Sequence, residues 1–179
     1  MFCQNIGNIT LKTKNFILIS GFCCKSFVTL YLYFKEKYYK MENLLKIPYT
    51  VFNNDWDLLQ QFLNRRGNPR YELVGDVELY NQQNIFDLGN LVRVDGDLLL
   101  HFTPIQSLGN LEYVNGDFHI TNIQISTLGN LRYVAGSLFL DTKIIQSLGN
   151  LEYVGGNIWL KRNHQIPPEQ LNNFKIKYY

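Results

Sequence analysis

Leu-Gly-Asn-Leu at residues 88–91 occurs again at residues 108–111, 128–131 and 148–151. The interval is 20 residues each time. A fixed period of roughly 20 to 50 residues is typical of a solenoid. One such unit is too small to bury its own leucines, but stacked units bury each leucine against its counterparts above and below. The sequence therefore predicts a solenoid of about five coils over residues 71–166.

Each unit also predicts a short β-strand. Apolar residues alternate with other residues directly after a glycine, as at Leu98 and Leu100 after Gly96. Alternation with a period of two is typical of a strand with one buried face. The segment 75–79 is an earlier, degenerate copy, whose glycine lies 21 residues before Gly96. Strands of successive coils are expected to pair in parallel, about 4.8 Å apart.

The asparagine of the repeated tetrapeptide is expected to lie at the same place in every coil. Stacked asparagine side chains can hydrogen-bond the neighbouring coil and so satisfy polar groups in a tight turn. The glycine before each asparagine is expected to take a backbone angle that other residues avoid. The alternative is a row of exposed amides that binds a ligand, and we favour the structural role. The column consists of Asn90, Asn110, Asn130 and Asn150.

The unit L-x-x-V-x-G-x-L-x-L, followed by I-x-S-L-x-N-L, resembles short leucine-rich repeats. It is particularly similar to the glycine-containing type of bacterial and phage-encoded repeat proteins, and to the coils of receptor L domains. The resemblance covers roughly residues 71–166. It implies an α/β fold, namely a right-handed solenoid with a parallel β-sheet on one face and short turns opposite, and a binding scaffold. The usual repeat has an asparagine three residues after the second strand leucine, where this chain has Thr103, Ile123, Lys143 and Asn163.

Charge and cysteines exclude several function classes. Residues 1–40 contain six lysines and one glutamate, a net charge of +5, whereas the remainder has 11 Lys and Arg against 14 Asp and Glu, a net charge of −3. A mildly acidic body argues against a nucleic-acid partner, which needs phosphate contacts from Lys and Arg. All three cysteines precede residue 25, so the repeats have neither a disulfide framework nor a metal-binding spacing of Cys and His. No cofactor or metal is expected.

Three interpretations of residues 1–40 are open. Two lysines before an apolar run fit the outline of a signal peptide, although no small-residue cleavage site follows. A membrane span over residues 16–34 has about the minimum length, but Lys25 in its middle is costly. Alternatively, Met41 is the natural start and residues 1–40 are an upstream extension. The protein is cytoplasmic in this last case and membrane-associated or secreted in the others; membrane contact is expected only through residues 1–40.

The repeats are flanked by two segments that are expected to cap them. Residues 41–70 predict an N-terminal helical cap, in which Asn54 or Asp55 starts a helix and apolar residues follow with helical spacing up to Arg66. The apolar face of this helix would cover the open end of the first coil. Residues 167–179 predict a C-terminal cap or tail, whose last residues alternate and either pair as an edge strand or hang free.

The outward strand residues between the buried leucines are the main candidate binding site. A contiguous apolar stripe on a rigid sheet indicates an interaction surface, and aromatic residues are good binding anchors. The alternatives are a stripe that another part of the chain covers, or one that packs in a homodimer. The stripe consists of Leu99, His119, Phe139 and Trp159, with Glu78 in the degenerate copy.

The next outward position adds His101, Asp141 and Lys161 as candidate binding residues with mixed chemistry. His101 and Asp141 suggest an active site, but they are expected two coils apart, at ~10 Å, which is too far for a hydrogen bond. No serine or cysteine nucleophile joins them. No catalytic residue is therefore assigned.

Asp76, Asp97 and Asp117 form a partial acidic column beside the glycines. Carboxylates ~5 Å apart can share a calcium ion. However, the glycine-rich nonapeptide that binds calcium in other solenoids is absent. We expect these short polar residues to shape the turn instead.

The sequence favours a non-enzymatic scaffold for protein–protein interaction that binds through the aromatic-rich sheet face. The alternative is an exported or membrane-tethered surface protein whose solenoid binds a host protein or a glycan. An enzyme of the parallel β-helix type is disfavoured, because such enzymes use many more coils and a carboxylate cluster. No glycine-rich phosphate loop, nucleophile elbow or metal-binding helix motif is present. The identity of the protein partner and the oligomeric state do not follow from the sequence.

Overall fold

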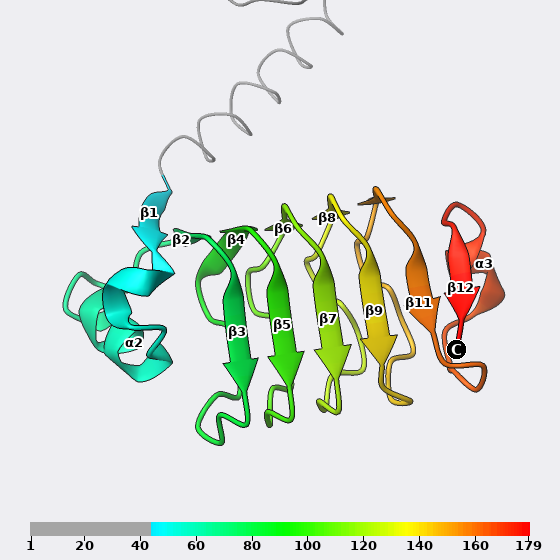
Figure 1. Ribbon diagram of the computed structural model, residues 1–179, viewed down its shortest axis with the longest axis horizontal. Coiled ribbons are helices and arrows are strands. Elements are labelled where there is room, and N and C mark those ends of the chain that lie inside the picture. The colour runs from blue at the N-terminus through cyan, green and yellow to red at the C-terminus, as the bar shows by residue number, and fades with distance from the viewer. Residues whose placement is uncertain (1–43) are drawn as a thin grey trace, which may run out of the picture. The chain divides into compact units, whose positions relative to one another are not determined.

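The computed structural model describes residues 44–179, and Figure 1 shows them as a row of stacked coils. The three interpretations of residues 1–40 fall outside the described residues. Within residues 44–179, no helix is both long and apolar enough to cross a membrane. Between residues 71 and 160 the chain passes back and forth between two parallel β-sheets, so that each coil gives one strand to each sheet.

Within residues 44–179 each sheet has six strands, and all of the strand pairs are parallel. In their order across the sheet, the strands of sheet A are β1 (Leu45–Pro48), β2 (Tyr71–Val74), β4 (Leu91–Asp95), β6 (Tyr113–Val114), β8 (Tyr133–Val134) and β10 (Tyr153–Val154). Those of sheet B are β3 (Val77–Tyr80), β5 (Leu98–His101), β7 (Phe118–Thr121), β9 (Leu138–Asp141), β11 (Ile158–Leu160) and β12 (Ile176–Tyr178).

Sheet B contains the strands that the alternating pattern predicts. In β5, β7 and β9, buried residues alternate with half-buried ones along the strand. The register places equivalent repeat positions side by side, as in the pairs Leu98 with Phe118 and Phe118 with Leu138. The predicted parallel solenoid with repeats of about 20 residues is therefore confirmed.

Sheet A corrects the expected arrangement of one sheet with short turns on the opposite side. The opposite side is a second parallel sheet, although β6, β8 and β10 are only two residues long. A two-residue strand has no alternation of its own, so a period of two cannot reveal it. Its hydrogen bonds come from the stacking of coils, a non-local effect.

Columns of leucine and valine fill the space between the two sheets. Leu91, Leu111 and Leu131 are fully buried, and so are Val94 and Val114. Burying one such side chain stabilises the fold by about 1.5–3 kcal/mol, which makes these columns the main cohesive element. The same columns extend through every coil, as expected for a core that only stacking can complete.

The turns of the repeated tetrapeptide have the predicted geometry. Their glycines have φ between 56 and 60°, the left-handed region that favours glycine. The asparagine ladder is confirmed by side-chain bonds between coils. Asn90 Nδ2 donates to the backbone oxygen of Asn68 at 2.7 Å, and Asn110 Nδ2 donates to Asn90 Oδ1 at 2.8 Å. Asn130 Nδ2 donates to the backbone oxygen of Gly109 at 3.0 Å.

Two α-helices are found within residues 44–179, α2 (Trp56–Asn64) and α3 (Pro168–Leu171), together with the 3-10 helix η1 (Tyr49–Phe52). The α2 helix lies inside the range predicted from Asp55 to Arg66. Asp55 is its N-cap, because the carboxylate accepts the backbone N–H of Leu58 at 3.0 Å.

The sequence left open whether the last residues of the chain pair as an edge strand or hang free. They form β12, which pairs in parallel with β11 and does not hang free. The α3 helix precedes this strand, and its Leu171 is buried against the core.

Candidate functional site

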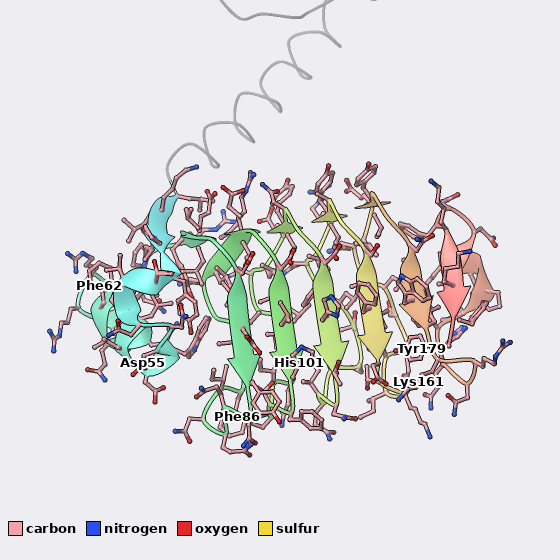
Figure 2. All side chains as sticks on the ribbon, in the orientation of Figure 1. Asp55, Phe62, Phe86, His101, Lys161 and Tyr179 are labelled. Atoms are coloured by element: carbon pink, nitrogen blue, oxygen red, sulfur yellow. The ribbon has the colours of Figure 1, made fainter. Side chains whose placement is uncertain are left out.

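The outward stripe predicted on sheet B exists, and its residues are neighbours. Leu99 pairs with His119, His119 with Phe139, and Phe139 with Trp159 across successive strands. All four side chains are half-buried. Figure 2 shows the side chains of this face on the row β5, β7, β9 and β11.

The rings of the stripe lie parallel to one another. The ring centroids of His119 and Phe139 are 4.0 Å apart with 10° between the planes, which requires the two faces to overlap. Phe139 and Trp159 lie 6.0 Å apart with 4° between the planes, a parallel and displaced arrangement. The three rings therefore stand nearly parallel along the outer face of sheet B.

His119 behaves as an aromatic rather than a charged member of the stripe. Burial of the ring lowers the pKa of His119 below its usual value, and the neighbouring His101 acts in the same direction. Asp117 and Asp97 oppose the shift but do not reverse it. At neutral pH the stripe therefore presents a neutral surface of one histidine, one phenylalanine and one tryptophan ring.

The candidate residues at the next outward position, His101, Asp141 and Lys161, are only partly brought together. His101 lies beside His119, with ring centroids 6.3 Å apart. Asp141 and Lys161 form an ion pair with each other, so their charges largely cancel. His101 and Asp141 are separated by Thr121, which pairs with both of them across the strands. The pairing that a catalytic interpretation would need is not formed.

Two exposed aromatic residues at the N-terminal coils extend the surface beyond the predicted stripe. Tyr80 and Phe102 have exposed fractions of 58% and 48%. The rings of Tyr80 and Phe102 meet edge to face, with centroids 5.8 Å apart. Tyr80 is also the strand neighbour of His101. We call the resulting surface the aromatic band; it consists of Phe102, Tyr80, His101, His119, Phe139 and Trp159.

Phe102 has a backbone conformation that is unusual for its residue type. Its φ is 52°, close to the 53° of Asn81 and the 51° of Asn122 at the same position of neighbouring coils. The left-handed region suits asparagine but costs most other residues about 1–2 kcal/mol. This column of the repeat reads Asn81, Phe102, Asn122, Thr142 and Arg162, and only its first three members have a positive φ, so the sequence alone does not mark Phe102 as strained.

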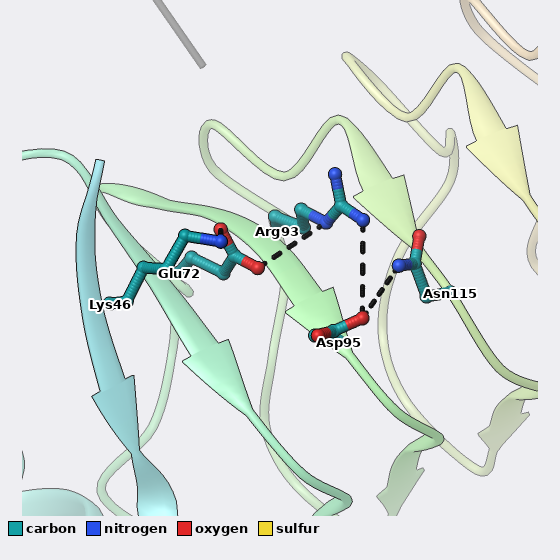
Figure 3. A network of polar contacts seen from close by, with 5 residues as sticks. All are labelled: Lys46, Glu72, Arg93, Asp95 and Asn115. Carbon is teal, nitrogen blue, oxygen red and sulfur yellow. Dashed lines mark hydrogen bonds and ion pairs between the residues drawn. The ribbon is translucent and has the colours of Figure 1, made fainter. Parts of the chain in front are cut away.

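The outward column of sheet A has a different composition. At its N-terminal end Lys46, Glu72 and Arg93 are strand neighbours (Figure 3). Glu72 is only 2% exposed, and its carboxylate lies 3.3 Å from Lys46 Nζ and 3.5 Å from Arg93 Nε. Arg93 also lies 3.9 Å from Asp95, which accepts a 2.6 Å bond from Asn115. These contacts form an ion network within the fold.

The same column continues as a row of tyrosines. Tyr113 and Tyr133 lie 6.3 Å apart, and Tyr133 and Tyr153 stack at 4.7 Å with 11° between the planes. Beside this row, Arg70 pairs with Glu112, and Arg132 pairs with Glu152. Sheet A therefore combines aromatic side chains with charge pairs, whereas sheet B presents the aromatic band.

The acidic column has backbone partners. Asp76 Oδ1 accepts the N–H of Asp97 at 2.8 Å, and Asp97 Oδ1 accepts that of Asp117 at 2.7 Å. Asp117 Oδ1 accepts the N–H of Ser137 at 2.6 Å. Each carboxylate thus links its coil to the next, which agrees with the expected role in the turn. No group of three or more His, Cys, Asp or Glu side chains that could hold a metal ion occurs in residues 44–179.

No family model matches this chain, and no curated protein or solved structure is significantly similar to it. The assignment of the solenoid therefore depends on the repeat and on the two parallel sheets.

Proposed function

We propose that this protein is a non-enzymatic scaffold for protein–protein interaction that binds its partner through the aromatic band. The observation that carries the proposal is the continuity of the band. Ring contacts join Phe102 to Tyr80, and a second series joins His101 to His119, Phe139 and Trp159; the two series meet where Tyr80 and His101 pair across neighbouring strands. Clustered aromatic residues on a rigid sheet can bury much apolar area at little cost in conformational entropy.

Each candidate binding residue on sheet B has a role in this proposal. Leu99, His119, Phe139 and Trp159 supply the apolar centre of the interface. The ion pair of Asp141 and Lys161 and the ring of His101 supply a polar rim that directs the orientation of the partner. Neither a cofactor nor a catalytic residue is part of the proposal, and the partner is a protein, not a nucleic acid.

We also propose that the chain is a right-handed solenoid of the leucine-rich-repeat type with α2 as its N-terminal cap. The buried side chains of α2 support the cap, because Trp56, Leu59 and Leu63 pack into the hydrophobic core. The repeat pattern supports the type.

The test compares the two faces of the solenoid. Phe139→Ser combined with Trp159→Gln removes the centre of the band, and Tyr133→Ser combined with Tyr153→Gln is the matched control on sheet A. Partners are identified by crosslinking and pull-down with the full chain, and each is then measured by titration. We expect the sheet B variant to lose binding by at least about tenfold, the size of a hot-spot loss.

Unchanged affinity of the sheet B variant for every recovered partner would reject the proposal. A loss in the sheet A variant alone would move the interface to the tyrosine row. Because these residues point outward, we expect both variants to fold. Circular dichroism and thermal melting check this expectation.

The alternative is an exported or membrane-tethered protein that binds a host protein or a glycan through the same face. The composition of residues 1–40 favours it, since they combine a net charge of +5 with an apolar run. The intact mass of the native protein, together with its distribution between membrane and soluble fractions, distinguishes these forms. A soluble protein that begins at Met41 favours the cytoplasmic scaffold, and a retained, membrane-bound segment favours the tethered form. Cleavage with release favours secretion.

A further inference from the structure

The β10 strand differs from the equivalent strands of sheet A in its burial. Its apolar residue Val154 is only partly buried, as is Leu151 before it, whereas the same positions in the preceding coils are fully buried. Tyr153 is 47% exposed. β10 is the last strand of sheet A within residues 44–179, so two core columns of the repeat are incompletely covered there.

The backbone of β10 faces outward on one side. In the preceding coils the carbonyl oxygens of Glu112 and Val114 accept N–H groups from the next strand, at 3.2 Å from Tyr133 and 2.9 Å from Ala135. Glu152 and Val154 hold the same positions in the last coil, and among residues 44–179 no strand follows. An exposed strand edge is a template for pairing with another extended chain.

The other edge strands carry residues that discourage such pairing. β1 contains Lys46 and Pro48, β3 contains Glu78, and β12 contains Lys177. Charged residues and proline are the usual means of blunting a sheet edge. β10 itself consists of Tyr153 and Val154, both suited to a strand, and contains no proline; the one charged residue of this segment, Glu152, lies directly before the strand.

We propose that the β10 edge binds an extended segment of a partner protein, which pairs in parallel as the next strand of sheet A. This site is separate from the aromatic band and does not depend on it. The repeat columns specify the chemistry of the segment: an apolar residue over Leu151, a basic residue beside Glu152, an aromatic residue over Tyr153, and a β-branched residue over Val154.

Two features narrow this chemistry further. In the column of Glu152 the charge alternates, because Glu152 follows Arg132 and Arg132 follows Glu112, so a basic residue suits the next place. The partner segment also needs a glycine two residues after the β-branched one. A Cβ at Gly116 would lie 2.7 Å from the carbonyl carbon of Gly96, a spacing that side chains do not tolerate. The motif is thus apolar, basic, aromatic, β-branched, any small residue, glycine.

A synthetic peptide with the sequence Leu-Gly-Asn-Leu-Arg-Tyr-Val-Ala-Gly, copied from residues 128–136, is the probe. A second peptide with glutamate in place of arginine is its matched control. The full chain, labelled with ¹⁵N, is titrated with each peptide and amide shifts are followed. We expect saturable shifts at residues 151–156, smaller shifts elsewhere, and a roughly two- to fivefold preference for the arginine peptide, as for an exposed ion pair.

Two variants make the test decisive. Glu152→Lys is expected to reverse the preference between the peptides. Val154→Pro is expected to abolish binding of both peptides, because proline has no N–H group to donate to them. The N–H groups of Tyr153 and Gly155 face β8, whereas that of Val154 faces the open side where the peptide pairs. Val154→Pro should leave the hydrogen bonds between β10 and β8 in place. Thermal melting of each variant tests whether it is folded.

Three results would overturn the proposal. The first is the absence of saturable shifts at residues 151–156, and the second is equal affinity of the wild type and Val154→Pro for the peptide. The third is self-association in sedimentation experiments that Val154→Pro abolishes, since the occupant would then be a second copy of this chain. The Phe139→Ser, Trp159→Gln variant should bind the peptide normally, so failure of one site is distinguishable from failure of the other.

Discussion

The outer faces of sheets A and B have the same backbone plan but different surfaces. Both consist of in-register columns in which one side chain per coil stacks on the next. On sheet A the column begins with Lys46, Glu72 and Arg93 and ends in tyrosines. On sheet B it begins with Glu78, continues through Leu99 and His119 to Phe139 and Trp159, and ends at Lys177. The repeat therefore fixes where a side chain lies, while its chemistry varies freely outside the core.

The comparison separates structural positions from candidate functional ones. Inward residues are leucine, valine, isoleucine or phenylalanine in nearly every coil, because the space between the sheets accepts only apolar side chains. Outward residues are not constrained in this way, so a continuous aromatic band on one face requires an explanation. Stacking alone is sufficient to explain the tyrosines of sheet A, whose neighbours are charge pairs.

The largest expected effect on stability comes from a substitution in the core between the two sheets. Phe118 is fully buried in β7, next to the outward His119. Phe118→Ala is expected to lower the free energy of unfolding by about 3–5 kcal/mol, because it removes a large buried ring and leaves a cavity. Phe139→Ala, on the outer face, should cost under about 1.5 kcal/mol. Chemical denaturation measures both, and equal losses would contradict the division into inner and outer positions.

An intermediate effect tests the ion network of sheet A against the ion pair of sheet B. Glu72 is buried between Lys46 and Arg93, so Glu72→Gln should lower the free energy of unfolding by about 1–3 kcal/mol. Asp141→Asn removes an ion pair whose partners are both about one-third exposed, and should cost at most about 1 kcal/mol. Denaturation at low and high salt measures the difference, since salt screens only the exposed pair well. A greater cost for Asp141→Asn would reverse the comparison.

Much of the fold follows from the sequence, because the repeat is regular. The strands of sheet B, the α2 helix and the asparagine ladder depend on local signals that recur at fixed positions. Sheet A could not be predicted in the same way. Its strands from β6 onward consist of two residues each, and only the stacking of coils makes them a sheet.

The candidate site likewise has residues that the sequence predicts and residues that it does not. Leu99, His119, Phe139 and Trp159 follow from the alternation within each strand, so their place on one face was predictable. The contribution of Phe102 was not, since it lies in the connection that follows β5. The ion pair of Asp141 and Lys161 also required the register of neighbouring coils.

A smaller effect concerns the connection that carries Phe102. Asn122 has nearly the same φ, 51° against 52°, and Asn122→Phe should therefore cost about 1 kcal/mol. The reverse change, Phe102→Asn, removes that cost and should not lower the melting temperature, although it deletes the contact with Tyr80. Thermal melting measures both variants. If Phe102→Asn weakens partner binding while retaining stability, the strained residue serves the interaction; a marked loss of stability would show that it serves the fold.

The smallest effect is a dependence of stability on pH through His119. Its pKa in the folded protein lies below the ordinary value of 6.5, chiefly because the ring is buried. Below about pH 6.5 the unfolded chain therefore binds a proton more readily than the folded protein does. The contribution of His119 to stability is complete above this pH and decreases as the pH falls toward the folded pKa. Denaturation between pH 7.5 and pH 5 should show the decrease, and His119→Gln should reduce its slope. An NMR titration of the His119 ring with a midpoint above 6.5 would contradict this sign. It would also mean that the centre of the aromatic band carries a charge near neutral pH, which would favour an acidic partner over an apolar one.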